Sequence, residues 1–219
     1  MRIAVLGSGG RMGSTLMEVL LEAGHDVVGF HRHETEDMLY SLEEYDLAVL
    51  SIPPRVADEI LSRERKYLGF VEVCASKSLM RKHSGRIISI HPLYGPMSYK
   101  EPSRRNTVLV KDISVEGSLG VVKRMLPRDR IIEMGFREHD EFVLHNLAVP
   151  YAVSLLASRL LGPGPHLPVS ARMALESMAS LVHGESMDVV TDMLQAYGVW
   201  PIIEAAVRSL EEGYREVVR

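Results

Sequence analysis

A glycine-rich turn near the N-terminus limits the fold of this chain more than any other feature. It reads GSGGRMG at residues 7–13, after the apolar run RIAVL at 2–6 and before helical apolar spacing at 12–23. A short apolar run that ends in glycine predicts a strand buried on both faces of a parallel sheet. Strand, glycine turn and helix together begin a dinucleotide-binding unit, because glycine lets a pyrophosphate approach the N–H groups at the helix N-terminus.

The turn fits the G-x-G-x-x-G fingerprint only in part. Gly7 and Gly9 match, but Met12 stands where the third glycine is expected, and Gly13 comes one position later. The alternative interpretation is a turn that only packs the helix against the sheet. We favour a dinucleotide site, and the residues expected to bind the cofactor in this turn are Gly7, Ser8, Gly9, Gly10, Arg11 and Met12.

A second predicted strand, at residues 25–30, leads into His31 and Arg32. In NAD sites the end of this strand usually carries a carboxylate for the ribose 2′-hydroxyl, whereas an arginine there suits a 2′-phosphate. His31 occupies the expected carboxylate position, about 20 residues beyond the glycine turn, and Arg32 follows it. We therefore expect NADP to be preferred over NAD, with His31 and Arg32 in the cofactor site. The alternative is a basic surface loop without a ligand.

Further predicted strands bring polar residues to one edge of the sheet. These strands are expected at residues 47–52, 70–75 and 86–90. They deliver Ser51, Ser76 and His91 to the carboxyl edge, where ligands of such folds bind. The loop after the first of them is expected to lie over the cofactor, and its cofactor-binding residues are Ser51, Ile52 and Pro53.

Two last strands are predicted at residues 106–110 and 130–134, and only helices follow. The helices are expected at residues 139–161, with a kink at Pro150, and at 169–182, 188–196 and 201–217. The chain is thus predicted to be an α/β dinucleotide-binding domain, residues 1–136, followed by a small all-helical domain, residues 137–219. The helices carry wide apolar stripes, so we expect this domain to pack against a second copy of the chain.

Composition excludes several classes of partner and site. The net charge of −4 argues against a nucleic-acid or anionic-membrane partner. No apolar run reaches the roughly 18 residues of a membrane span and no secretory signal is present, so a cytoplasmic protein is expected. The single cysteine, Cys74, lies in an apolar run and is predicted to be a buried core thiol. The histidines show no metal-ligand spacing, so no metal site is expected.

The motifs together resemble a known family of enzymes. The segment HPLYGP at residues 91–96, the pair Ser76-Lys77, the glycine turn and the later Glu138-His139-Asp140 resemble the prephenate dehydrogenase family of tyrosine biosynthesis, which includes arogenate dehydrogenases. This resemblance implies a Rossmann-type domain followed by a helical substrate and dimerisation domain in a homodimer. It also implies oxidative decarboxylation of prephenate to 4-hydroxyphenylpyruvate, with hydride transfer to the nicotinamide.

The resemblance also implies roles for individual residues. His91 matches the family's catalytic histidine and would accept the proton of the substrate's ring hydroxyl. Ser76 matches a serine that bonds that hydroxyl or the histidine. Tyr94 and Gly95 are expected at the substrate, and Arg172 is the candidate for a substrate carboxylate, with Arg104 and Arg105 as alternatives. Lys77 could attract a cofactor phosphate or the substrate, or face water, and is not counted as catalytic.

Departures from the family pattern leave other interpretations open. The helical domain is short for the family, and Pro150-Tyr151 stands where members often carry a further histidine. These differences allow arogenate or another substrate in place of prephenate. His139 is interpreted as helix-start chemistry. The rival enzyme is a small deazaflavin-dependent NADP oxidoreductase, which has no need for His91 at a strand end. The rival from another class is a non-catalytic nucleotide-binding relative.

Overall fold

The computed structural model of the chain describes residues 1–67, 69–161, 170–183 and 187–217. It divides into two compact units, Met1–His139 and Asp140–Arg219. The predicted domain boundary, after residue 136, lies three residues before the observed one, at the start of helix α5 (Phe136–Val143).

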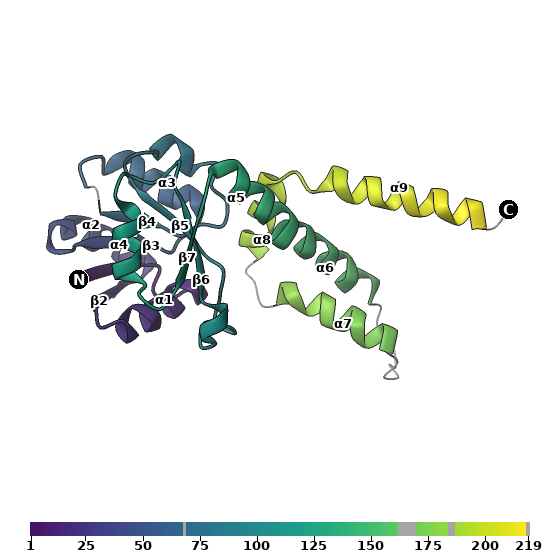
Figure 1. Ribbon diagram of the computed structural model, residues 1–219, viewed down its shortest axis with the longest axis horizontal. Helices are drawn as coiled ribbons and strands as arrows, with labels where there is room; N and C mark the ends of the chain where they lie inside the picture. Colours follow the sequence, from purple (N-terminus) through teal and green to yellow (C-terminus); the bar gives the residue numbers. More distant parts are fainter. Residues whose placement is uncertain (68, 162–169, 184–186, 218–219) are drawn as a thin grey trace. The chain divides into compact units, whose positions relative to one another are not determined.

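The N-terminal unit is built on a seven-stranded sheet with strand order β2-β1-β3-β4-β5-β6-β7 (Figure 1). Strands β1 to β5 pair in parallel, β6 runs antiparallel to β5, and β7 is parallel to β6. The strands are β1 (Arg2–Leu6), β2 (Asp26–Phe30), β3 (Leu47–Leu50), β4 (Phe70–Glu72), β5 (Ile88–Pro92), β6 (Asn106–Val110) and β7 (Arg130–Met134).

Each strand lies near the apolar run that predicts it, but β3 ends at Leu50 rather than at residue 52 and β5 lies two residues later than expected. The fourth strand is also shorter than expected. Strand β4 ends at Glu72 rather than at Ala75. The reason is local: the Glu72 carboxylate accepts a hydrogen bond of 2.9 Å from the backbone N–H of Cys74, which takes that N–H out of the sheet ladder. The loop that follows carries Ser76 and Lys77.

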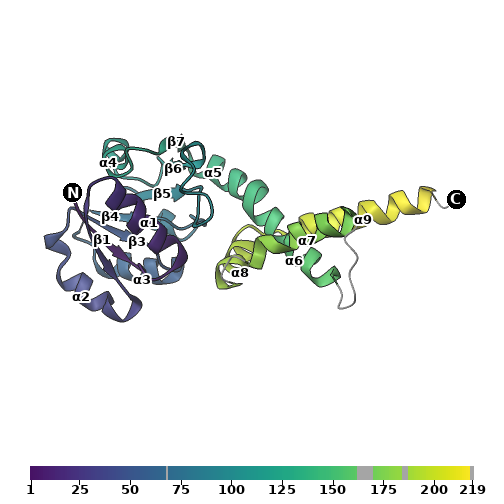
Figure 2. The same ribbon diagram turned by 90° about the horizontal axis from the view of Figure 1, so that it is seen from below.

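Helices cover both faces of the sheet, as Figures 1 and 2 show. Residues of β1 alternate between two apolar clusters: Ala4 and Leu6 point to one, Ile3 and Val5 to the other. The first cluster includes α2 and α3, and the second includes α1 and α4. The helices of this unit are α1 (Arg11–Glu22), α2 (Thr35–Tyr40), α3 (Pro54–Arg63), α4 (Ser118–Met125) and the start of α5. This is the predicted α/β fold of Rossmann type.

The C-terminal unit consists of helices in the part of the chain that is described. After α5, a π-helical turn, Leu144–Ala148, precedes Pro150 in the first turn of the next helix. π-Turns and proline both disturb the hydrogen-bond ladder, and the kink expected at Pro150 stays a prediction. The helices are α6 (Val149–Leu160), α7 (Ser170–His183), α8 (Met187–Ala196) and α9 (Trp200–Val217).

Helices α6 and α7 lie side by side in this unit (Figure 1). Ser154 joins them: its hydroxyl donates to the carbonyl of Met178 at 2.7 Å. Residue 169, at the start of a predicted helix, lies outside the described residues. No helix within the described ranges is long and apolar enough to cross a membrane.

The close approach of α1 to β1 depends on Gly13. Gly13 is buried in the first turn of α1, and a Cβ there would lie 2.0 Å from the carbonyl oxygen of Gly7. Gly13 is therefore the glycine that lets the helix pack on the strand end, the role that the fingerprint assigns to its last position. Counting from Gly7 placed that position at Met12, which was one residue too early for this turn.

We predict that Gly13→Ala destabilises the protein, whereas Gly120→Ala does not. The new methyl at position 13 meets backbone and should lower the free energy of unfolding by about 1–3 kcal/mol. At Gly120, in the exposed part of α4, the methyl would lie 3.6 Å from the mobile end of Arg124, so alanine should stabilise the helix by about 0.5–1 kcal/mol. Chemical denaturation measures both, and equal effects would contradict the packing role of Gly13.

Candidate active site

The glycine turn forms a cradle in which a side chain has no room. Gly7 has a φ of +85°, and a Cβ on it would lie 2.1 Å from the carbonyl oxygen of Ser51. Its N–H donates to the carbonyl of Phe30 at 2.9 Å, which ties the turn to the end of β2. Gly10 is the N-cap of α1 and has no side chain to cap the first-turn N–H groups. Those groups suit an anion such as a pyrophosphate.

Basic side chains surround the end of β2, next to this cradle. The ring of His31 lies against Gly9, where a Cβ would come within 2.7 Å of its Nδ1. The rings of His31 and His33 stack with centroids 5.9 Å apart, and Arg32 between them in sequence is exposed. The nearby carboxylate of Glu34 accepts the N–H of His31 at 2.6 Å. The Glu34 carboxylate therefore caps the backbone at His31. The exposed side chains of His31, Arg32 and His33 form a basic surface.

The loop after β3 reaches the same edge of the sheet. The N–H of Ser51 donates to the carbonyl of Leu6 at 3.0 Å, which places Ser51 and Ile52 beside the glycine turn. Pro53 is the N-cap of α3, and Pro54 begins that helix. Strand β3 ends at Leu50, two residues before its predicted end at Ile52, and neither proline can donate to the ladder. The predicted roles of Ser51, Ile52 and Pro53 in cofactor binding stay predictions.

His91 lies in β5 and is 6% exposed. Its Nδ1 is 3.1 Å from Nε2 of His139, which is fully buried in α5, and the two rings meet edge to face. Burial lowers the pKa of His91 well below its usual value, and the charges of Lys77 and His139 lower it further. His91 is therefore a neutral imidazole near pH 7, able to accept a proton.

A buried ion pair underlies this histidine. Lys77 and Glu72 are both fully buried, and Lys77 Nζ lies 2.7 Å from Glu72 Oε1 and donates to the carbonyl of Ile90 at 2.6 Å. The hydroxyl of Ser89 also donates to Glu72. The alternatives considered for Lys77, a surface charge or a phosphate ligand, do not fit a side chain that is enclosed and already paired. Its position beside Ile90 links the pair to the backbone of His91.

Ser76 is not among the hydrogen-bond partners of His91 in the described residues. Its hydroxyl lies 3.2 Å from that of Ser78, at the more exposed end of the same loop. The predicted bond from Ser76 to His91 or to a substrate hydroxyl stays a prediction. The group that does bond to His91 is His139, which the sequence analysis interpreted as helix-start chemistry. That interpretation missed its burial against β5.

Tyr94 points into the core of the N-terminal unit. It is 4% exposed, and its hydroxyl donates to Asp129 at 2.8 Å. Burial and the carboxylate of Asp129 raise the pKa of Tyr94. Thr107 and Arg105 bond to the same carboxylate at 2.8 and 2.9 Å, so Tyr94 belongs to a buried polar cluster. The expected contacts of Tyr94 and Gly95 with substrate stay predictions.

The three candidate arginines lie in different settings. Arg172, in α7, pairs with Glu176 on the same helix at 2.9 Å. Arg104 pairs with Glu101 on the surface, at 2.7 Å. Arg105 is 5% exposed and bound to Asp129, which makes it a structural cation. Arg172 remains the predicted substrate-binding arginine.

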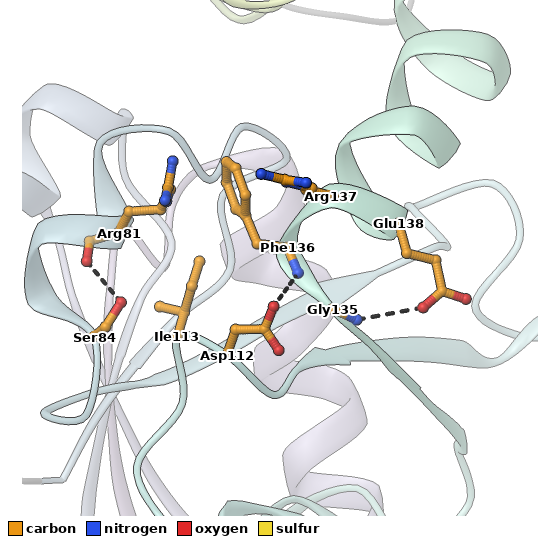
Figure 3. A pocket seen from close by; sticks show the side chains of 8 residues that line it. All are labelled: Arg81, Ser84, Asp112, Ile113, Gly135, Phe136, Arg137 and Glu138. Carbon is orange, nitrogen blue, oxygen red and sulfur yellow. Dashed lines mark hydrogen bonds between the residues drawn. The ribbon is translucent and has the colours of Figure 1, made fainter.

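A cavity of about 320 Å³ lies beside the start of α5 (Figure 3). Asp112 and Phe136 line it, and the Asp112 carboxylate accepts the N–H of Phe136 at 2.9 Å. Arg81 lies 4.4 Å over the ring of Phe136, and Glu138 accepts the N–H of Gly135 at 3.3 Å. The carboxylates suit the positive end of the helix. They anchor the helix that carries His139.

Solved structures with the same fold are prephenate and arogenate dehydrogenases. Prephenate dehydrogenase from Aquifex aeolicus, in complex with hydroxyphenyl propionate and NAD+, aligns with a TM-score of 0.73 and 17% identity over 100% of this chain and 91% of that chain. Synechocystis arogenate dehydrogenase aligns with a TM-score of 0.62 and 19% identity, over 99% of this chain and 89% of that one. The similarity inferred from the motifs is thus confirmed at the level of the fold.

The same fold extends to other nicotinamide enzymes. Pyrroline carboxylate reductase from Plasmodium falciparum, with NADP bound, aligns with a TM-score of 0.53 and 14% identity over 100% of this chain and 92% of that chain. No protein-family profile matches this sequence, and no curated protein matches it. Among the described residues, no group of three or more histidine, cysteine, aspartate or glutamate side chains could hold a metal ion.

We predict that Lys77→Met lowers the free energy of unfolding by about 3–5 kcal/mol, because it leaves the Glu72 carboxylate buried without its cation. The double variant Glu72→Gln/Lys77→Met removes both charges and should recover most of this loss. Lys82→Met is the control, since Lys82 pairs with Asp58 on the surface and its loss should cost less than about 1 kcal/mol. Equal losses for Lys77→Met and Lys82→Met in urea denaturation would contradict a buried pair.

Proposed function

We propose that this protein is an NADP-dependent prephenate dehydrogenase that acts in tyrosine biosynthesis. The observation that carries the proposal is the buried imidazole of His91 at the carboxyl edge of a Rossmann-type sheet, with its Nδ1 3.1 Å from Nε2 of His139. The solved structures of the same fold support it, because they include prephenate and arogenate dehydrogenases. Binding of the cofactor is assigned to residues 1–136, and binding of substrate to the helical residues 137–219.

The glycine cradle fits the pyrophosphate of a dinucleotide. A Cβ at Gly7 or Gly13 would collide with backbone, so the turn brings its N–H groups close to a ligand at the start of α1. Gly9, Gly10, Arg11 and the basic surface of His31 and Arg32 complete the proposed site. The nicotinamide, when bound, supplies the hydride acceptor.

His91 would act as the base of the reaction. The substrate loses a hydride from the ring carbon that bears the hydroxyl, and the hydroxyl proton passes to Nε2 of His91 as the C=O bond forms. The ring carboxylate then leaves as CO2, its bonding electron pair enters the ring, and the resulting phenolate takes up a proton. Aromatisation drives this loss. The histidine must be neutral before the first step, and burial of His91 favours this form because it lowers the pKa.

We further infer that the chain forms a homodimer through its helical part. Large apolar side chains are exposed on α7, α8 and α9, among them Met173, Leu181, Met187, Trp200 and Val207. Patches of this kind on a small helical unit favour packing against another surface. A second copy offers the same apolar side chains.

The proposal is tested by mixing the protein with prephenate and NADP+ and following the absorbance of reduced nicotinamide. We expect turnover that His91→Asn lowers by about 10²- to 10⁴-fold, the usual contribution of a positioned base. Affinity for NADP+, measured by calorimetry, should not change, since His91 lies outside the glycine cradle.

Parallel assays with arogenate, and with NAD+, separate the alternatives. Turnover of arogenate alone would replace the substrate while keeping the mechanism. Cofactor binding without turnover of either substrate would point to a non-catalytic relative or another reductase. Near-normal turnover by His91→Asn would remove His91 from the mechanism.

Cofactor choice is tested separately at Arg32. We expect Arg32→Gln to raise the KM for NADP+ by about 10- to 100-fold, because a charge-assisted hydrogen bond to the 2′-phosphate is lost. The KM for NAD+ should be unchanged. Lys66→Gln, an exposed charge before β4, is the matched control and should leave both values unchanged. Equal effects on both cofactors would contradict the assignment of Arg32.

A further inference from the structure

His91 and His139 share one hydrogen bond inside the N-terminal unit. His91 is 6% exposed and His139 is fully buried, and the bond joins Nδ1 of the first to Nε2 of the second at 3.1 Å. One of these two nitrogens carries the hydrogen and the other offers a lone pair. The fully buried ammonium of Lys77 opposes any further positive charge nearby. Two neutral arrangements therefore remain possible.

The two arrangements differ in what His91 can do. If His139 Nε2 donates, a neutral His91 carries its own hydrogen on Nε2 and cannot accept a proton there. If His91 Nδ1 donates, its Nε2 holds a lone pair and can act as a base. Only the second arrangement serves the proton transfer described above.

We propose that His139 is a positioning residue for His91: its Nε2 accepts the hydrogen of His91 Nδ1 and fixes the tautomer that leaves His91 Nε2 as the basic atom. This inference rests on the proposed function, because the need for a base at Nε2 comes from the reaction. No contact of His139 with substrate or cofactor is required.

The surroundings hold both rings in place. The N–H of His139 donates to the carbonyl of Gly135 at 2.9 Å, and the first turn of α5 is capped by Asp112. On the other side, Lys77 bonds to the carbonyl of Ile90, directly before His91 in β5. A rigid strand and an anchored helix thus meet at the histidine pair, as the support of a reacting group requires.

The tautomer can be measured without substrate, by nitrogen-15 NMR of the histidine side chains. Signals of His91 are assigned by their absence from His91→Gln. We expect the wild-type protein to show a protonated Nδ1 and an unprotonated Nε2 on His91. The opposite pattern in the wild-type protein would overturn the proposal, whatever the variants do.

Two substitutions of His139 then test its role. His139→Gln can place an oxygen near the former Nε2 and should retain the tautomer, whereas His139→Leu fills the space without an acceptor and should lose it. With prephenate, we expect His139→Leu to lower kcat by about 10- to 1,000-fold with little change in KM, and His139→Gln to restore most of the rate. Equal tautomers in the two variants would overturn the proposal. Absence of turnover in the wild-type protein would refute the proposed function, while the NMR result would still decide the tautomer.

Discussion

Parallel pairing of β1 to β5 is the constraint on which the site depends. It brings the carboxyl ends of four neighbouring strands, β1, β3, β4 and β5, to one edge of the sheet. This arrangement brings to one edge of the sheet the glycine turn, Ser51, the loop that carries Lys77, and His91. Strand β6 runs antiparallel to β5, and β7 keeps the direction of β6. Strand β7 ends where Met134 pairs with Val110 of β6, close to the level of Ser89 in β5. Helix α5 therefore begins one strand away from β5, and its His139 bonds to His91.

The buried pair of Lys77 and Glu72 is costly in a sheet of this kind. Strands covered on both faces are normally apolar throughout, and removing two charges from water costs several kcal/mol for each ion. The pair is nevertheless well satisfied, because Glu72 also accepts from Ser89 and from the Cys74 N–H, and Lys77 also donates to Ile90. Such a network fixes the geometry of β4 against β5. Because Lys77 bonds to the carbonyl of Ile90, the network also holds the backbone directly before His91.

Local pattern predicted the elements well, because apolar runs and glycine or proline stops are properties of neighbouring residues. All the strands and the helix that follows the glycine turn could be predicted in this way. The antiparallel step between β5 and β6 could not, since both runs are equally apolar in either direction. The partner of His91 is 48 positions away, and nothing beside His139 in the sequence signals its burial. Lys77 was misinterpreted for the same reason: its partner Glu72 lies within an apolar run that gives no sign of a buried carboxylate.

The segment HPLYGP, which carries most of the resemblance to prephenate dehydrogenases, has two separate physical functions. His91 faces the histidine of α5, whereas Tyr94 faces Asp129 and joins Thr107 and Arg105 in a buried cluster. Part of the motif therefore serves folding, and only part of it is available for chemistry. A match to the whole segment supports the base and the strand that holds it, but it does not specify the substrate. Tyr151, which stands where the resemblance leads us to expect a further histidine, lies outside this segment, in α6.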